Sequence, residues 1–171
     1  MNRLFSIVLT VAMFSGLTVS AQQDKSKRVS PPAQVSQTLG KGATVTIVYS
    51  QPSLKGRKVG TDLATYGKVW RTGANEATVF EVSKDVKVEG KALPAGKYSL
   101  YTIPGEKEWT IIFNKSWDQW GTKYSESQDQ LRVSVKPEKT ESFKEKMMFE
   151  ISKDGEVSLE WGDTEIEFEV K

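Results

Sequence analysis

Residues 97–114 read KYSLYTIPGEKEWTIIFN, and this stretch decides the fold class. Before the Pro104-Gly105 pair, Tyr98 and Leu100 alternate with other residues, and after it every second position from 109 to 113 is large and apolar. Alternation with a period of two is typical of strands that bury one face, and a short Pro-Gly connection joins such strands as a hairpin. We therefore predict antiparallel strands at residues 97–103 and 109–114.

Further strands follow from the same pattern on both sides of this hairpin. In the last of them Ile166, Phe168 and Val170 alternate with glutamates, so we expect its outer face to be solvated. Asp154-Gly155 and Gly162-Asp163 are turn signals that separate the final strands, and one short helical turn is expected near residues 141–146. Together with this last strand, the predicted strands outside the hairpin lie at residues 29–37 (an edge strand or strap), 43–49, 78–82, 86–88, 131–135, 147–152, 157–161 and 165–170.

About nine short strands without alternating helices predict an all-β fold, an antiparallel β-sandwich, with a β-barrel as the alternative. Two irregular loops interrupt this pattern, at residues 50–66 and 116–130. Long irregular loops inside a compact domain are usually functional or disordered. The first loop leads directly into Tyr66–Thr78, so we favour a functional role for this region.

The N-terminus has the features of a secretory signal peptide. Arg3 gives a positive start, residues 4–19 form an apolar run, and Val19-Ser20-Ala21 matches a small-x-small cleavage site. The run is shorter than the ~20 apolar residues that the alternative, a membrane anchor, needs. We predict a signal peptide at 1–21, a flexible lead-in at 22–30, a single β-sandwich domain at 31–171, and a periplasmic or secreted protein with no membrane span after signal cleavage.

The composition excludes several chemistries. The chain has 171 residues with no Cys and no His, which rules out thiolate nucleophiles, Ser-His-Asp triads and zinc sites built from Cys or His. Of its 24 basic and 22 acidic residues, only Arg3 lies in the signal segment, so the mature chain is close to neutral. This balance argues against a nucleic-acid partner. The acidic segment Asp118–Asp129 lacks the regular Asp/Asn spacing of a calcium loop, and we assign no metal and no cofactor.

The segment Trp70–Glu76 is the first candidate for a binding site. Trp70 offers a flat apolar face, and Arg71 a planar fork suited to a carboxylate, a phosphate or a pair of sugar hydroxyls. Gly73 permits a tight bend, and Asn75 donates and accepts hydrogen bonds. In the alternative interpretation, Arg71 pairs with Glu76 and Asn75 caps the turn, which locks the loop in one shape.

The second candidate is the pair Trp117 and Trp120, which lies in a polar stretch beside Asn114 and Asp118. Indoles accompanied by amides are typical of sugar-binding sites, where a ring face stacks on C–H groups. Alternatively, both rings form a small core that pins the loop to the sheet. Lys97 and Tyr101 lie on the hairpin face opposite Tyr98 and Leu100, where they either border the same cleft or face solvent.

Several motifs resemble a known family. They are Tyr49–Arg57, Tyr66–Thr78, Leu93–Pro104, Trp109–Lys115 and the pair Trp120-Gly121. Together they resemble the secreted bacterial family called domain of unknown function 2911, which is found largely in Bacteroidetes. The resemblance extends from Pro31 to the end of the chain. It implies an exported single-domain β-protein and assigns no catalytic residue.

Three functions from different classes are open at this point. The first is an exported, non-catalytic binding domain that presents both loops as one patch to a glycan or another cell-envelope ligand. The second is a structural or assembly protein of the envelope, and the third is a carboxylate-dependent hydrolase using Glu76 with Asp118. We rank binding first, because the usual catalytic side chains are absent, and we name no catalytic residue. The residues of the predicted binding site are Trp70, Arg71, Asn75, Glu76, Lys97, Tyr101, Asn114, Trp117, Asp118 and Trp120.

Overall fold

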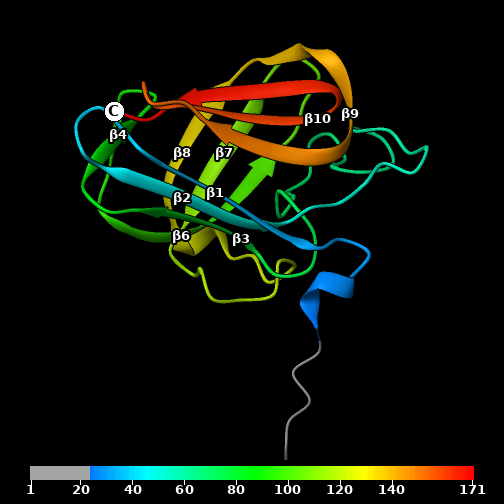
Figure 1. Ribbon diagram of the computed structural model, residues 1–171, viewed down its shortest axis with the longest axis horizontal. Coiled ribbons are helices and arrows are strands. Elements are labelled where there is room, and N and C mark those ends of the chain that lie inside the picture. The colour runs from blue at the N-terminus through cyan, green and yellow to red at the C-terminus, as the bar shows by residue number, and fades with distance from the viewer. Residues whose placement is uncertain (1–23) are drawn as a thin grey trace, which may run out of the picture.

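A computed structural model describes residues 24–171 of the protein (Figure 1). The predicted signal peptide at residues 1–21 lies outside the described residues. None of the helices in the described range is long and apolar enough to cross a membrane. The strands are β1 (Pro32–Thr38), β2 (Thr44–Ser50), β3 (Thr78–Val82), β4 (Val86–Val88), β5 (Lys91–Leu93), β6 (Gly96–Ile103), β7 (Trp109–Asn114), β8 (Asp129–Val135), β9 (Pro137–Ile151) and β10 (Glu156–Glu169), and the 3₁₀ helices are η1 (Lys25–Lys27) and η2 (Glu126–Gln128).

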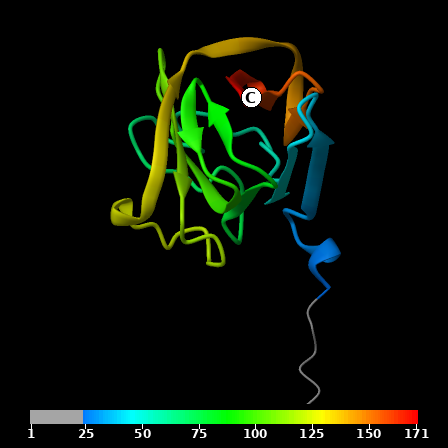
Figure 2. The same cartoon turned by 90° about the vertical axis from the view of Figure 1, so that its left-hand side faces the viewer.

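Six strands form the main sheet in the order β1-β2-β3-β6-β7-β8, with every neighbouring pair antiparallel. Strands β9 and β10 form a long hairpin, and β4 and β5 a short one. The start of β9 arches away from β8, and the β9–β10 hairpin lies over one face of the main sheet (Figures 1 and 2). The strands of residues 24–171 form these three sheets and do not close into one barrel. The predicted antiparallel sandwich is therefore confirmed.

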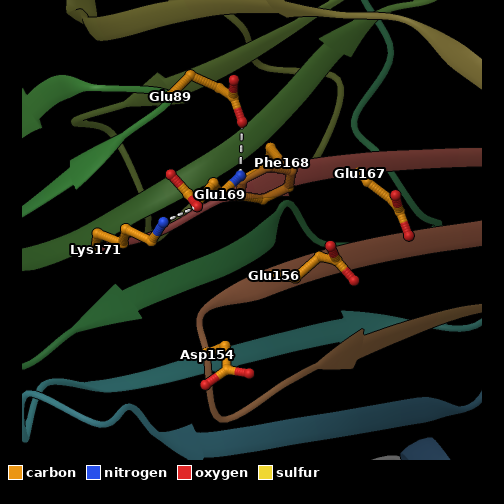
Figure 3. A pocket seen from close by; sticks show the side chains of 7 residues that line it. All are labelled: Glu89, Asp154, Glu156, Glu167, Phe168, Glu169 and Lys171. Carbon is orange, nitrogen blue, oxygen red and sulfur yellow. Dashed lines mark hydrogen bonds and ion pairs between the residues drawn. The ribbon is translucent and has the colours of Figure 1, made fainter.

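Strand β10 shows the alternation that its sequence predicts. Ile166 and Phe168 are buried, whereas Glu167 and Glu169 between and after them are exposed. Figure 3 shows these two glutamates on the hairpin together with Glu156 from the start of the same strand. One face of the hairpin therefore contributes to the core, and the other presents carboxylates to solvent.

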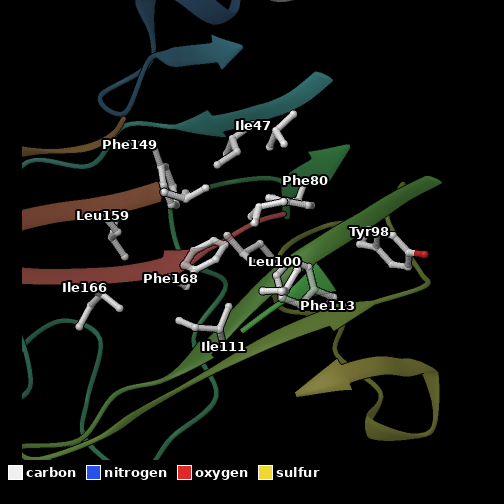
Figure 4. Packing of buried hydrophobic residues seen from close by; sticks show 14 of the residues in the cluster. Ile47, Phe80, Tyr98, Leu100, Ile111, Phe113, Phe149, Leu159, Ile166 and Phe168 are labelled. Carbon is white, nitrogen blue, oxygen red and sulfur yellow. The ribbon is translucent and has the colours of Figure 1, made fainter. Parts of the chain in front are cut away.

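The main core lies between the six-stranded sheet and the β9–β10 hairpin (Figure 4). Leu100 of β6 pairs in register with Phe113 of β7, which confirms the hairpin predicted from residues 97–114. The Phe113 ring meets Phe80 of β3 edge-on at 5.0 Å and Phe168 of β10 at 6.1 Å. Edge-to-face contacts of this kind join the two layers through rings that are at most 3% exposed.

The other face of β6 and β7 carries a smaller apolar cluster. Tyr101 pairs with Ile112 across the two strands, and both are buried together with Ala77. The ring of Tyr124, from the loop that follows β7, meets the Tyr101 ring at 4.9 Å. This loop therefore covers the outer face of the sheet, where it meets the segment before β3.

Three local predictions are wrong. Residues 141–146, expected as a helical turn, belong to β9, because pairing with β10 along its length favours the strand. Gly162-Asp163 does not end a strand: β10 continues through it, and the register shifts on both sides of Gly162 mark a β-bulge. Residues 91–93, which lie outside all the strands predicted above, form β5 and pair with β4.

Candidate functional site

The two candidate segments, residues 70–76 (the first loop from here on) and residues 117–122 of the second loop, lie directly against each other. Glu76 and Trp120 form an antiparallel bridge, and the Gly121 N–H donates to the carbonyl oxygen of Asn75 at 3.1 Å. A Cβ atom on Gly121 would lie only 2.4 Å from Cδ of Arg71 and 2.9 Å from that carbonyl oxygen. Only glycine permits so close an approach without a shift of the neighbours. We call the combined surface of residues 70–76 and 117–122 the two-loop surface.

A hollow of about 220 Å³ opens beside this junction. It is lined by Tyr101 of β6, by Val69, Trp70 and Arg71 of the first loop and its approach, and by Gly121, Thr122 and Tyr124 of the second loop. The guanidinium of Arg71 makes one long hydrogen bond, from Nε to the Gly73 carbonyl oxygen at 3.4 Å. Within residues 24–171 no carboxylate lies within ion-pair distance of it. Arg71 therefore offers donors to a ligand at this hollow.

The indoles of Trp117 and Trp120 are on the surface, with 40% and 47% of their area exposed. The ammonium group of Lys97 lies 5.1 Å from the centre of the Trp117 ring and 3.3 Å from a carboxylate oxygen of Glu81. A cation over an indole face orients the ring without burying it. Asp118, at the tip between the two indoles, is exposed. Lys97, Trp117, Asp118 and Trp120 are therefore all on the outer surface. The two indoles do not form the small core of the alternative interpretation.

Trp70 and Tyr101 point inward instead. The Trp70 ring stacks on Trp161 at 5.5 Å with an interplanar angle of 11° and meets Trp109 edge-on at 6.3 Å. Tyr101 is 1% exposed, accepts a hydrogen bond from the Gln119 side chain at 3.1 Å, and has a pKa raised by its burial. Both residues line the hollow, but most of the surface of each side chain packs against other residues of the protein.

Asn114 is fully buried and holds the second loop in place. Its Nδ2 donates to the Ser125 carbonyl oxygen and to Oδ1 of Asp129, both at 2.8 Å. Its Oδ1 accepts a hydrogen bond from the Ser116 N–H at 3.0 Å. Because all three bonds stay within the protein, Asn114 positions the loop and does not face a ligand.

Asn75 and Glu76 connect the first loop to the segment before β1. The Asn75 amide donates to the Ser30 carbonyl oxygen at 3.1 Å. The Glu76 carboxylate accepts hydrogen bonds from Nη1 of Arg28 at 2.8 and 3.0 Å and lies 3.1 Å from Nζ of Lys25. Both side chains hold the loop in place, as the locked-loop alternative expects, but through other partners: Glu76 pairs with Arg28 and not with Arg71, and the Asn75 amide bonds to Ser30.

The electrostatics of Glu76 bear on the hydrolase hypothesis. Burial alone would raise its pKa, but the hydrogen bonds from Arg28 and Lys25 outweigh this effect and lower the pKa to about 2. A two-carboxylate hydrolase needs one carboxyl group whose pKa is raised so that it can donate a proton. Glu76 is held ionised at neutral pH, so it is unsuited to that role. Neither Glu76 nor Asp118 lines the hollow.

We expect Glu76→Gln to lower the free energy of unfolding by about 1 kcal/mol at pH 7. The pKa falls from 4.5 to about 2 on folding, but the side chain is 38% exposed, so solvent screening reduces the effect. Because the folded-state pKa is the lower one, the stabilisation is present above the unfolded-state pKa and disappears as the pH falls from about 5 to about 2. Urea unfolding of both proteins at pH 7 and near pH 2 measures this difference, and a gap that persists at the acid end would contradict an electrostatic origin.

Sequence reasoning missed two contributors to this site. Tyr124 donates to Oδ2 of Asp129 at 2.7 Å and accepts from Nη2 of Arg132 at 2.7 Å; burial, reinforced by Asp129, raises its pKa to about 12. An aromatic residue in the polar stretch of residues 121–130 is the signal that could have identified it. Arg28 lies in a segment expected to be flexible, and no local pattern points to Glu76 as its partner.

The described residues hold no cluster of three or more His, Cys, Asp or Glu side chains that could bind a metal ion. In comparisons with known proteins, the model of a family described as protein of unknown function (DUF2911) matches residues 30–170. No curated protein and no solved structure matches the chain significantly.

Proposed function

This chain belongs to the DUF2911 family, and we propose that it is an exported, non-catalytic binding domain that presents the two-loop surface to a glycan of the cell envelope. The observation that carries this proposal is the direct pairing of the loops, in which Glu76 bridges to Trp120 and Gly121 bonds to Asn75. This pairing brings the backbone segment that carries Arg71 against the segment that carries the half-exposed Trp117 and Trp120. Open ring faces stack on the C–H groups of sugars, and a guanidinium donates to their hydroxyls.

The ten predicted residues divide into two groups by position. Arg71, Lys97, Trp117, Asp118 and Trp120 have side chains on the outer surface or at the hollow, where they reach a ligand. The others act from behind: Asn114 fixes the second loop, Asn75 and Glu76 tie the first loop to residues 25–30, and Trp70 and Tyr101 anchor both to the sheet.

Pre-organisation supports binding at this surface. Both loops are held by hydrogen bonds to each other and to the sheet, including the Ser99 hydroxyl that donates to the Ser116 carbonyl oxygen at 2.6 Å. A ligand that meets a surface already in its binding shape does not have to order the loops first, so more of the contact energy appears as affinity. Export rests on the signal-like residues 1–21, and fractionation of cells that produce the full chain tests it.

We expect Trp120→Ala to weaken glycan binding at least tenfold, which corresponds to about 1.4 kcal/mol. An array of envelope and host glycans probed with residues 22–171 identifies the ligand, and isothermal titration calorimetry then measures Kd for both proteins. Trp120 is 47% exposed, so its removal should leave the melting temperature nearly unchanged.

Phe143→Ala is the matched control, because Phe143 is an aromatic residue on β9 that is 60% exposed. Its removal should leave the Kd unchanged. The proposal fails if the array shows no binding, or if the double variant Trp117→Ala/Trp120→Ala binds the selected glycan as tightly as the Phe143 variant does.

A further inference from the structure

A second hollow, of about 650 Å³, lies at the end of the sandwich where several segments of the chain meet. Figure 1 shows the C-terminus beside β4 at this end. The walls come from the β1–β2 turn, the start of β4, Ala92 of β5, the β9–β10 turn and the last two residues. We call this hollow the end basin. It is separate from the two-loop surface and shares no lining residue with it.

The interior of the end basin is apolar. Leu39, Ala43, Val86 and Val170 line it and belong to the main core, with at most 6% of their area exposed. Ala92 adds an exposed methyl group. No polar side chain of the described residues therefore covers the core at the bottom of the basin. An apolar ligand that enters the basin would pack directly against the core.

The rim of the end basin is positively charged. Lys41, Lys84, Lys87 and Lys153 are exposed around it, and none of the four forms an ion pair within residues 24–171. A fifth lysine, Lys171, contacts Glu169. Two side-chain carboxylates in the lining, Asp85 and Asp154, oppose them, and Asp85 already accepts the Ala95 N–H at 2.8 Å.

The neighbouring groove carries the opposite charge. Figure 3 shows Glu89, Glu156, Glu167 and Glu169 around it, with Asp154 and Lys171 shared between the groove and the basin. An anion that approaches this end of the molecule is repelled by the groove and attracted by the rim lysines. The charge distribution therefore favours a negatively charged head group at the basin.

We propose that the end basin binds a medium-chain fatty acid, with the acyl chain in the hollow and the carboxylate among the rim lysines. The volume lies in the range of about 300–1,000 Å³ that small-molecule sites occupy. A single-chain amphiphile with one negative charge matches an apolar hollow that has a basic rim. The surface of a bilayer is flat and does not fill a concave basin, so a free amphiphile fits this site better than a membrane does.

The first experiment titrates residues 22–171 with octanoate, decanoate and dodecanoate below their micellar concentrations, using isothermal titration calorimetry. We expect saturable binding that tightens about threefold to fourfold for each added methylene group, and weaker binding of dodecanol than of dodecanoate at low salt. Binding that does not saturate, or that is independent of chain length, overturns the proposal.

The second experiment locates the binding. Ala92→Glu places a carboxylate at an exposed position in the wall, and we expect it to weaken dodecanoate binding at least tenfold. The triple change of Lys41, Lys84 and Lys153 to Gln should do the same. The matched control changes Lys58, Lys68 and Lys107 to Gln, which alters the net charge equally at exposed positions outside the basin.

Equal losses in the two triple variants would show a long-range charge effect and overturn the basin as the site. A loss of dodecanoate binding in Trp117→Ala/Trp120→Ala that the basin variants do not share would assign the ligand to the two-loop surface instead. Co-sedimentation with vesicles of phosphatidylcholine and phosphatidylglycerol is the third arm. Vesicle binding that needs the rim lysines, without binding of monomeric dodecanoate, would show a membrane surface as the partner and overturn the proposal.

Discussion

Gly155→Ala is expected to lower the free energy of unfolding by about 3 kcal/mol. Gly155 lies in the turn between β9 and β10 with a φ of 94°, a backbone conformation that costs an L-residue about 1–2 kcal/mol. A Cβ atom there would lie 1.9 Å from the carbonyl oxygen of Val170. Because that neighbour is backbone, the added methyl group must displace either the turn or the end of the chain.

The end of the chain has little freedom to move. Val170 donates its N–H to the Gly155 carbonyl oxygen at 2.7 Å and forms a bridge to Val88, so one residue joins the β9–β10 turn to β4. Displacing it opens the core at Val170, which is fully buried. The steric loss therefore adds to the conformational one.

Gly90→Ala separates the two contributions. Gly90 also has a positive φ, 76°, but a Cβ atom there would meet nothing within 4 Å. We expect a loss of about 1 kcal/mol from its backbone conformation alone. Urea unfolding followed by circular dichroism measures both variants. If Gly155→Ala is no more destabilising than Gly90→Ala, the close approach of Val170 to the turn is incorrect.

The sequence was sufficient to predict the strands whose signal is local. The β6–β7 hairpin shows its alternation and its turn within residues 97–114, and pairing with neighbours only reinforces that pattern. The course of β10 could not be predicted in the same way, because Gly162-Asp163 has the composition of a turn. Pairing with Lys144 on the preceding strand β9, which lies outside the few residues that make up the turn signal, makes Gly162 the position of a bulge. Non-local pairing outweighs local turn preference there.

The residue types of the candidate site could be predicted from the sequence, but which of its side chains are exposed and which are buried could not. Trp117 and Trp120 lie in a polar stretch and are on the surface, as the binding hypothesis requires. Trp70 lies in an equally polar context, yet its ring stacks on Trp161, a residue of β10 far along the chain. Which indole faces outward depends on the other layer of the sandwich, and one stretch of sequence does not contain that information.

The reason for a glycine at position 121 could not be predicted from the local sequence either, because it depends on the contact between the two loops. A Trp-Gly pair indicates a turn, and the turn alone needs no glycine at this position, because Gly121 does not have a positive φ. The requirement comes from Arg71 and the Asn75 carbonyl oxygen, which pack where a Cβ atom would be. The reason for this glycine is therefore visible only once both loops are in place.

Asn114→Ala is expected to lower the free energy of unfolding by about 3 kcal/mol and to abolish glycan binding, although Asn114 itself faces no ligand. The change removes three hydrogen bonds, to Ser116, Ser125 and Asp129. Each buried polar group left without its partner costs about 1–3 kcal/mol, and water that enters the site offsets part of the sum. The loop that carries Trp117 and Trp120 then loses its attachment at the end of β7.

Two further variants make this prediction specific. Asn114→Asp keeps the shape and the acceptor for the Ser116 N–H, but it replaces the donor with an anionic oxygen beside the Asp129 carboxylate, so at pH 7 it should destabilise at least as strongly as Ala. Gln130→Ala, at an exposed position of β8, should stay within about 0.5 kcal/mol of the wild type. Unfolding in urea gives the stabilities, and calorimetry with the selected glycan gives the affinities. If Asn114→Ala is destabilised but binds the glycan with normal affinity, the prediction is wrong. The indoles would then bind independently of the loop's attachment, because a surface that depends on Asn114 for its shape should lose affinity when Asn114 is replaced.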